Sequence, residues 1–143
     1  MNIKSNKSIY LADDDADDCM LFEDALREIS ISTELTTAND GVELITLMES
    51  TVPPAPDIIF LDLNMPRMNG IECLIKIRNN HINIPVIILS TSNSEELIRQ
   101  TKTLGASGYI CKPDNFKKYR SVMKDVLSID WKKHDPLFYL SID

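Results

Sequence analysis

The chain has 143 residues, of which 43% are hydrophobic and 26% charged, and its 15 lysine and arginine residues against 22 aspartate and glutamate residues give a net charge of −7. This length and composition suit one ordinary globular domain, so we expect no separate effector domain. The negative charge repels phosphate backbones and argues against binding to nucleic acid. The longest apolar run, 84–89, is too short to span a membrane, and residues 1–7 lack the apolar core of a secretion signal. We therefore expect a cytoplasmic protein without membrane association.

Short apolar runs predict four buried strands, at 9–12, 58–61, 86–89 and 109–111. The runs are non-alternating and rich in isoleucine, leucine and valine, which is typical of strands covered on both faces in a parallel sheet. A more polar segment, 34–38, suits a fifth strand at an edge. Apolar residues at helical spacing lie between and after these strands, at about 17–30, 42–48, 71–77, 97–104 and 116–127.

This alternation of strand and helix predicts an α/β domain with a doubly wound parallel sheet. A polar second strand at the edge favours the flavodoxin-like order 2-1-3-4-5, so the expected architecture is (βα)5. We assign the domain to residues 1–127 and a C-terminal tail without an effector domain to residues 128–143. The tail contains Trp131, Phe138 and Tyr139, and this concentration of aromatic residues suggests that it docks on the body or on a second protomer.

Polar side chains follow four of the predicted strands at the points where they end. Asp13 and Asp14 follow the first strand, Asp62 the third, Ser90 the fourth and Lys112 the fifth. In open α/β sheets, ligands bind outside the carboxyl ends of the strands, where the strand order reverses. Because that point lies between the first and third strands here, we expect these side chains to form one site.

Three carboxylates close together need a cation, since two like charges about 4 Å apart repel by about 4 kcal/mol at an effective dielectric constant near 20. Oxygen donors without histidine or cysteine favour a hard divalent ion, and Mg²⁺ suits a phosphoryl-transfer site better than a Ca²⁺ cage does. A carboxylate beside Mg²⁺ can attack phosphorus and form an aspartyl-phosphate. Lys112 and Ser90 would neutralise and hydrogen-bond the phosphoryl oxygens.

Four segments resemble the signature of response regulator receiver domains of the chemotaxis-regulator kind: Asp13-Asp14, 62–70 (DLNMPRMNG), Ser90-Thr91 and 105–113 (GASGYICKP). The resemblance covers about residues 9–127. Within the family, the acidic run 13–18, the segment 22–28 and Trp131 resemble small stand-alone regulators that are paired with phytochrome-like histidine kinases.

The resemblance implies individual roles. Asp62 would accept the phosphoryl group, with Lys112 and Ser90 in contact with it, and Ser90 and Tyr109 would form a conformational switch. The implied metal ligands are Asp14 as the principal one, Asp13, Asp62 and the backbone carbonyl of Asn64. The Lys112–Pro113 peptide bond is often cis in such domains.

The function implied is that of a two-component receiver, which takes a phosphoryl group from a histidine kinase and signals through altered protein–protein contacts. It would be no conventional enzyme, because it would catalyse only its own phosphorylation and dephosphorylation. The output would use the face of the fourth helix, fifth strand and fifth helix, where a downstream protein or a second protomer would bind. We expect Tyr109 to leave the surface when Ser90 moves toward a phosphoryl oxygen, and Lys117, Lys118 and Arg120 to favour an acidic partner.

Several other interpretations fit less well. A flavin-binding protein would need a phosphate loop after the first strand, where the carboxylates would repel the cofactor. An Asp-x-Asp phosphatase would need an acid at Asn64. A calcium loop at 13–18 would need glycine at Asp18 and glutamate at Asp24, so Asp17 and Asp18 are better explained as favourable charges in the first turn of a helix. The main alternative is a phosphorylation-independent interaction module on the same fold.

Overall fold

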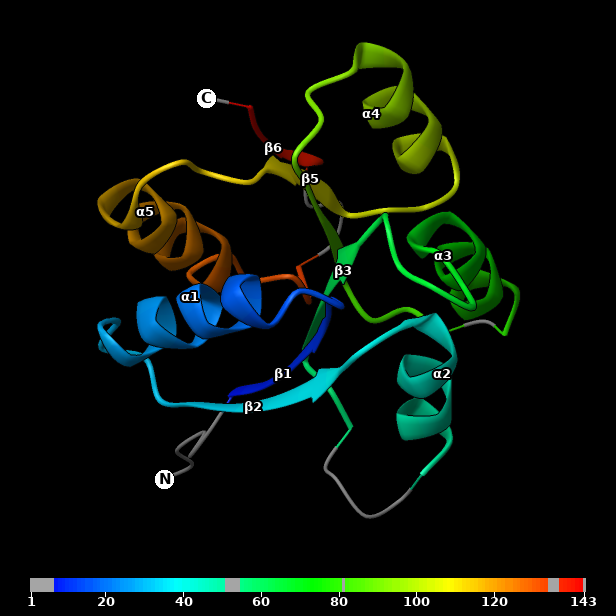
Figure 1. The fold of residues 1–143 in the computed structure, drawn as a ribbon, viewed down its shortest axis with the longest axis horizontal. Coiled ribbons are helices and arrows are strands. Elements are labelled where there is room, and N and C mark those ends of the chain that lie inside the picture. The colour runs from blue at the N-terminus through cyan, green and yellow to red at the C-terminus, as the bar shows by residue number, and fades with distance from the viewer. Residues whose placement is uncertain (1–6, 51–54, 81, 134–136, 143) are drawn as a thin grey trace.

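A parallel sheet of six strands, ordered β2-β1-β3-β4-β5-β6, forms the centre of the computed structural model, in which residues 7–50, 55–80, 82–133 and 137–142 are described (Figure 1). Its strands are β1 (Lys7–Ala12), β2 (Thr33–Ala38), β3 (Ile58–Asp62), β4 (Val86–Ser90), β5 (Gly108–Cys111) and β6 (Tyr139–Ser141). The helices are α1 (Ala16–Arg27), α2 (Gly41–Glu49), α3 (Gly70–Asn79), α4 (Glu95–Thr103) and α5 (Phe116–Leu127).

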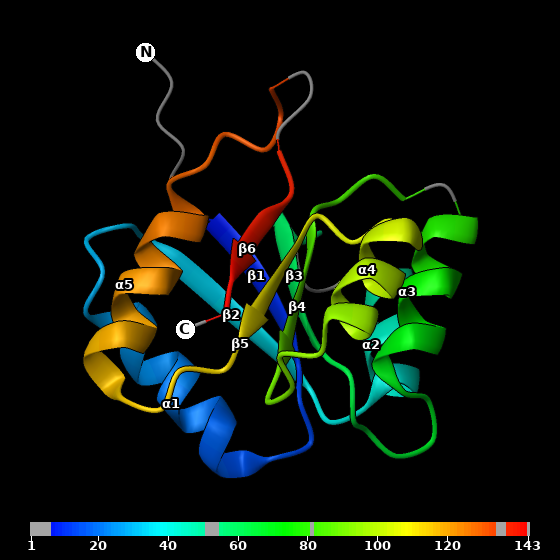
Figure 2. The same cartoon turned by 90° about the horizontal axis from the view of Figure 1, so that it is seen from above.

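Helices cover both faces of the sheet, with α1 and α5 on one side and α2, α3 and α4 on the other (Figure 2). The central strands contribute side chains to the cores on both faces of the sheet. In β3, Ile58 and Phe60 enter the core beneath α1 and α5, whereas Ile59 and Leu61 enter the opposite core. A strand buried on both faces has no polar side, which explains the continuous apolar sequences of β3 and β4.

The predicted fold class and the order 2-1-3-4-5 are confirmed. β2 lies at one edge and is mostly part-exposed, as its polar sequence suggested. All five helices are present, although α1 ends at Arg27 and not near 30. Ile29 is 8% exposed and packs into the core from the turn after α1, so the apolar spacing continues beyond the helix itself. No helix among the described residues has the length and apolar content needed to cross a membrane.

A sixth strand, β6, was not predicted. Tyr139 aligns with Gly108 of β5, and its backbone N–H donates to the Ser107 carbonyl at 3.0 Å. Phe138 packs against the core beneath α2, α3 and α4, and Tyr139 packs against the core beneath α1 and α5. Trp131 also joins the second of these cores and donates from its indole N–H to the Val126 carbonyl at 3.2 Å. The described part of the tail therefore docks on the body of its own chain.

Candidate functional site

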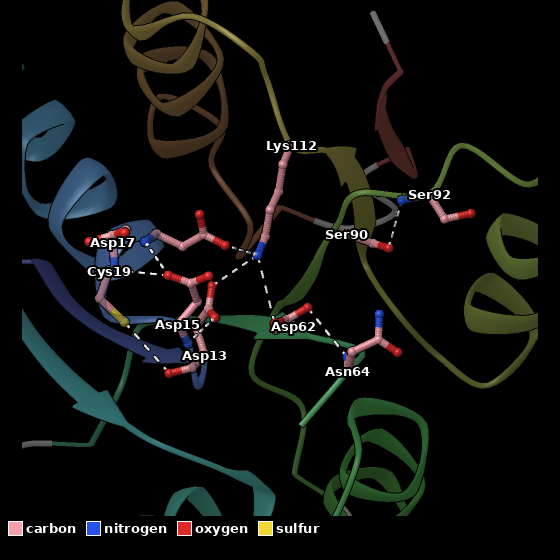
Figure 3. A network of polar contacts seen from close by, with 10 residues as sticks. Asp13, Asp15, Asp17, Cys19, Asp62, Asn64, Ser90, Ser92 and Lys112 are labelled. Carbon is pink, nitrogen blue, oxygen red and sulfur yellow. Dashed lines mark hydrogen bonds and ion pairs between the residues drawn. The ribbon is translucent and has the colours of Figure 1, made fainter. Parts of the chain in front are cut away.

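The candidate site lies at the carboxyl ends of β1, β3, β4 and β5 (Figure 3). Strand register brings these ends together: Ala12 aligns with Leu61, Asp62 with Leu89, and Ser90 with Cys111. Asp13 therefore follows β1 directly beside the end of β3. The strand register therefore brings the strand-end side chains together at one edge of the sheet, as expected from their positions in the sequence.

Three carboxylates form the acidic part of the site. Asp13, Asp14 and Asp62 each offer one oxygen, and these oxygens all lie within 4.8 Å of one another. Asp13 is 2% exposed and Asp62 6% exposed, whereas Asp14 is exposed to solvent. Two buried carboxylates at this distance repel each other strongly, because little water screens them.

Local backbone geometry holds Asp13 in place. Its N–H donates to the Ala38 carbonyl of β2 at 3.0 Å, and one carboxylate oxygen accepts from the N–H of Asp15 at 2.9 Å. Asp15 in turn caps α1, because its carboxylate accepts from the N–H groups of Asp17 and Asp18 at 2.8 and 3.2 Å. The acidic run that begins at Asp13 thus serves two purposes, an acidic site and a helix start.

Lys112 supplies the cation of the site. Its Nζ lies 2.6 Å from an Asp18 oxygen, 3.1 Å from an Asp13 oxygen and 3.7 Å from an Asp62 oxygen, and its side chain is 10% exposed. Burial acts to lower the pKa of Lys112, but the hydrogen bond to Asp18 and the charges of Asp62 and Asp13 outweigh it and raise that pKa. The ammonium therefore stays charged. The Lys112–Pro113 bond is trans, like every peptide bond of the described chain, so the cis bond is not found.

Asp62 has a perturbed pKa. Burial of its carboxyl group, reinforced by the neighbouring Asp13 carboxylate, raises the pKa from 3.8 to about 6, although Lys112 partly offsets this. The backbone N–H of Asn64 also donates to the Asp62 carboxylate, at the long distance of 3.4 Å. Burial and the Asp13 charge therefore destabilise the ionised form of Asp62 near neutral pH, and a bound cation would offset this free-energy cost.

The loop after Asp62 is folded tightly back onto β3. Gly70 donates its N–H to the Leu63 carbonyl at 3.0 Å, and a Cβ at this position would collide with the Asp62 carbonyl oxygen. Within the loop, Arg67 has a positive φ of 65° and donates to the Asp40 carboxylate at 2.7 Å. This hydrogen bond lowers the pKa of Asp40. The loop that contains Asn64 is therefore anchored at both β3 and the start of α2.

Ser90 and Tyr109 meet at one loop residue. The Ser90 hydroxyl, 1% exposed, accepts from the Ser92 N–H at 3.1 Å, and the Tyr109 hydroxyl donates to the Ser92 carbonyl at 2.7 Å. Tyr109 is fully buried, with 0% exposure. The ring thus lies in the inward position in this structure, and its movement on phosphorylation stays a prediction. Ser92 was not among the predicted residues.

Asp18 is the second residue that sequence reasoning missed. It was explained as a favourable charge at the start of α1, yet its carboxylate makes the shortest contact to Lys112. The two residues are 94 positions apart in sequence, so only tertiary packing, in which α1 lies against α5, the helix that follows β5, brings them together. Its position in the first turn of α1, four residues after Asp14, was the one available signal.

The donor set fits a hard divalent cation. Asp13, Asp14 and Asp62 present carboxylate oxygens that can converge on one ion, and nitrogen or sulfur donors take no part in this cluster of described residues. Lys112 balances only part of their negative charge. Carboxylates of this kind, with one member exposed to solvent, suit Mg²⁺ or Mn²⁺.

Comparisons with known proteins agree with this geometry. Residues 9–124 match the family model of the response regulator receiver domain. The response regulator Rcp1 of Synechocystis is 31% identical over 136 residues, which cover 90% of this chain and 92% of Rcp1. The chain spans only 26–45% of several longer curated relatives.

Solved structures give the same result. The Mn²⁺-bound form of Rcp1 superposes with a TM-score of 0.77 at 28% identity, covering 90% of this chain and 97% of that one. The phosphorylated cyanobacterial phytochrome response regulator RcpA has a TM-score of 0.77 at 32% identity, covering 85% and 91%. A CheX–CheY complex with BeF3 and Mg²⁺ from Borrelia burgdorferi has a TM-score of 0.73 at 27% identity, covering 86% and 90%.

Proposed function

The chain belongs to the response regulator receiver family, and from this premise we propose that it accepts a phosphoryl group from a histidine kinase onto Asp62 in a Mg²⁺-dependent reaction. The membership makes it a signalling protein and not a conventional enzyme. The observation that carries the proposal is the position of Asp62, a buried carboxylate at the end of β3 that shares one cluster with Asp13 and Asp14 and lies 3.7 Å from Lys112.

The chemistry follows from these side chains. An Asp62 oxygen attacks phosphorus, the bond from phosphorus to the donor nitrogen or oxygen breaks, and the donor leaves with the electron pair. Lys112 neutralises charge on the phosphoryl oxygens. The Ser90 hydroxyl accepts from Ser92, so its own proton is free to donate to a phosphoryl oxygen. A Mg²⁺ held by Asp13, Asp14, Asp62 and the Asn64 carbonyl supplies further charge neutralisation when it is bound.

The kinase is proposed to be of the phytochrome type. The support is the likeness to RcpA, which is described as a phytochrome response regulator, and to Rcp1, which matches over nearly its whole length. Nothing in the donor chemistry requires this choice, because any phosphohistidine presents the same phosphoryl group. A direct test is phosphotransfer from a purified phytochrome kinase compared with transfer from an unrelated histidine kinase, with the first expected to be faster.

The output is proposed to pass through the face formed by α4, β5 and α5, with a downstream protein or a second protomer as the partner. β6 lies along β5 on this face, so a partner meets β6 as well (Figure 2). Of the basic residues expected to favour an acidic partner, Arg120 forms an ion pair with Glu28 at 2.6 Å. Lys117 and Arg120 line one pocket together with Glu28, near the end of α1. These two residues therefore face α1 and not α4.

Mass spectrometry after incubation with acetyl phosphate and Mg²⁺ tests the proposed function. We expect one added phosphoryl group that is stable in acid and labile in base, as an acyl phosphate is. Asp62→Asn should abolish the label, whereas Asp17→Asn, which also removes one carboxylate, should keep it. Full labelling of Asp62→Asn would refute the assignment, and an unlabelled parent would favour the phosphorylation-independent interaction module.

A further inference from the structure

We propose that Asp18 is a positioning residue that holds Lys112 on the α1 side of the site, and that this ion pair must weaken when Lys112 shifts toward a phosphoryl group on Asp62. The inference rests on the proposed function of Asp62. It concerns a side chain outside the cluster of Asp13, Asp14 and Asp62.

The contacts of the Lys112 ammonium are unequal. Its Nζ is 2.6 Å from Asp18 and 3.1 Å from Asp13, both within hydrogen-bonding distance, but 3.7 Å from Asp62, which is beyond it. Figure 3 shows the ammonium between the acidic residues of the β1–α1 segment and Asp62. An ammonium has three N–H donors, and here two of them are used for Asp18 and Asp13 and none for the phosphoacceptor Asp62.

The structure keeps Asp18 firmly in this position. Its backbone N–H is bound by the Asp15 cap at 3.2 Å, which fixes the first turn of α1. The Asp18 side chain is 30% exposed and that of Lys112 only 10%, so the ion pair is partly shielded from water. A charged hydrogen bond in such surroundings is stronger than one at an open surface.

Phosphorylation changes the balance of these contacts. A phosphoryl group on Asp62 brings additional negative charge and strong acceptor oxygens to the side of Lys112 that Asp18 does not occupy. The ammonium must then give up part of its contact with Asp18, while the Asp18 carboxylate repels the incoming charge. Both effects make Asp18 oppose the phosphorylated state, so this residue sets how readily the site accepts a phosphoryl group.

Beryllofluoride affinity in the presence of Mg²⁺, measured by calorimetry, tests this role on the full chain. Asp18→Asn keeps the shape of the side chain but removes its charge, and we expect it to bind beryllofluoride about fivefold more tightly than the parent. Asp17→Asn is the matched control. Asp17 is exposed, and its carboxylate contacts no cation among the described residues, so we expect a change of less than about twofold.

A conservative variant separates positioning from a merely structural role. Asp18→Glu retains the charge and has room to extend at this part-exposed position, so it should bind beryllofluoride within about twofold of the parent. Mg²⁺ affinity without beryllofluoride should shift equally in Asp18→Asn and Asp17→Asn, because neither residue belongs to the metal cluster.

Three outcomes would decide against the inference. Equal beryllofluoride affinities for Asp18→Asn and Asp17→Asn would show that only net charge matters. Weaker binding by Asp18→Asn would show that the ion pair helps the site and does not oppose it. An Asp18→Glu variant that behaves like Asp18→Asn would show that the fit of the side chain, and not its charge, is decisive. In contrast, a parent that fails to bind beryllofluoride with Mg²⁺ would refute the proposed function itself.

Discussion

At the carboxyl ends of β1 and β3 the chain buries two carboxylates beside one ammonium, whereas along β5 it buries apolar and aromatic side chains on both faces of the sheet. The first region costs folding free energy, because repulsion and lost hydration disfavour the ionised Asp62. The second region contributes favourable folding free energy through apolar burial. The contrast indicates that binding chemistry is concentrated in a region which the rest of the fold must stabilise, and substitutions at four positions test this comparison.

The largest expected effect is at Tyr109 of β5. Tyr109→Ala removes a fully buried ring and should lower the free energy of unfolding by about 3–5 kcal/mol. Tyr109→Phe keeps the ring and removes only the hydrogen bond to the Ser92 carbonyl, so it should cost about 1 kcal/mol. Urea denaturation of both variants gives these values. A small loss of unfolding free energy in Tyr109→Ala would contradict the comparison, because β5 would then contribute little to stability.

The same two variants of Tyr109 can be used to test the Ser90–Tyr109 switch. Because Tyr109→Ala threatens the fold, Tyr109→Phe is the better probe of partner binding or self-association with and without beryllofluoride. We expect Tyr109→Phe to keep Asp62 phosphorylation and to respond less than the parent in association, measured by sedimentation.

Asp62→Asn should stabilise the protein in the absence of metal. A carboxyl group whose pKa rises from 3.8 in the unfolded chain to about 6 in the folded one contributes stability below pH 3.8, and this contribution is lost as the pH rises through 6. The shift corresponds to at most about 3 kcal/mol. The variant should therefore exceed the parent in stability at pH 8 with EDTA, and the difference should shrink toward pH 4.

Asp17→Asn serves as the control for that measurement, since Asp17 is an exposed carboxylate. Added Mg²⁺ should stabilise the parent and leave Asp62→Asn nearly unchanged, because ligand binding to the folded state adds to its stability. A pH-independent difference between parent and variant would contradict the view that Asp62 ionisation is costly.

Gly108→Ala should weaken the β5–β6 contact. An added Cβ would lie 2.9 Å from the Tyr139 carbonyl oxygen and 3.0 Å from the Ile87 Cδ1 atom, so β6 must move, at a cost of about 2 kcal/mol. Hydrogen exchange should show loss of protection in β6 while β2, at the opposite edge, stays unchanged. Retained protection of the β6 amides would mean that the edge accommodates the methyl group.

Asp14→Ala should have the smallest effect on stability, within about 0.5 kcal/mol in the absence of metal, because Asp14 is the exposed member of the cluster. Mg²⁺ affinity, measured by calorimetry, should nevertheless fall by about tenfold or more, as expected when a carboxylate ligand is lost. A marked loss of metal-free stability would indicate that Asp14 has a structural role.

Local sequence patterns predicted most of the fold and most of the site. The continuous apolar runs of β3 and β4 indicated strands covered on both faces, and Asp13, Asp14, Asp62 and Lys112 were recognised from their positions at strand ends. These predictions succeed because period, burial and strand direction are properties of short segments. The end of α1 was misplaced because Ile29 is buried outside the helix, and burial alone does not distinguish the two cases.

Long-range contacts were decided only by the tertiary structure. The pairing of Asp18 with Lys112, the hydrogen bond of Tyr109 to Ser92, and the addition of β6 to β5 each join segments that lie apart in the sequence, and neither segment of a pair indicates the other. The sequence alone determined which side chains reach the carboxyl edge of the sheet, because strand order and direction follow from local alternation. Which partner each side chain contacts there depends on ångström-scale packing of helices and loops around that edge, and this packing is a property of the whole chain.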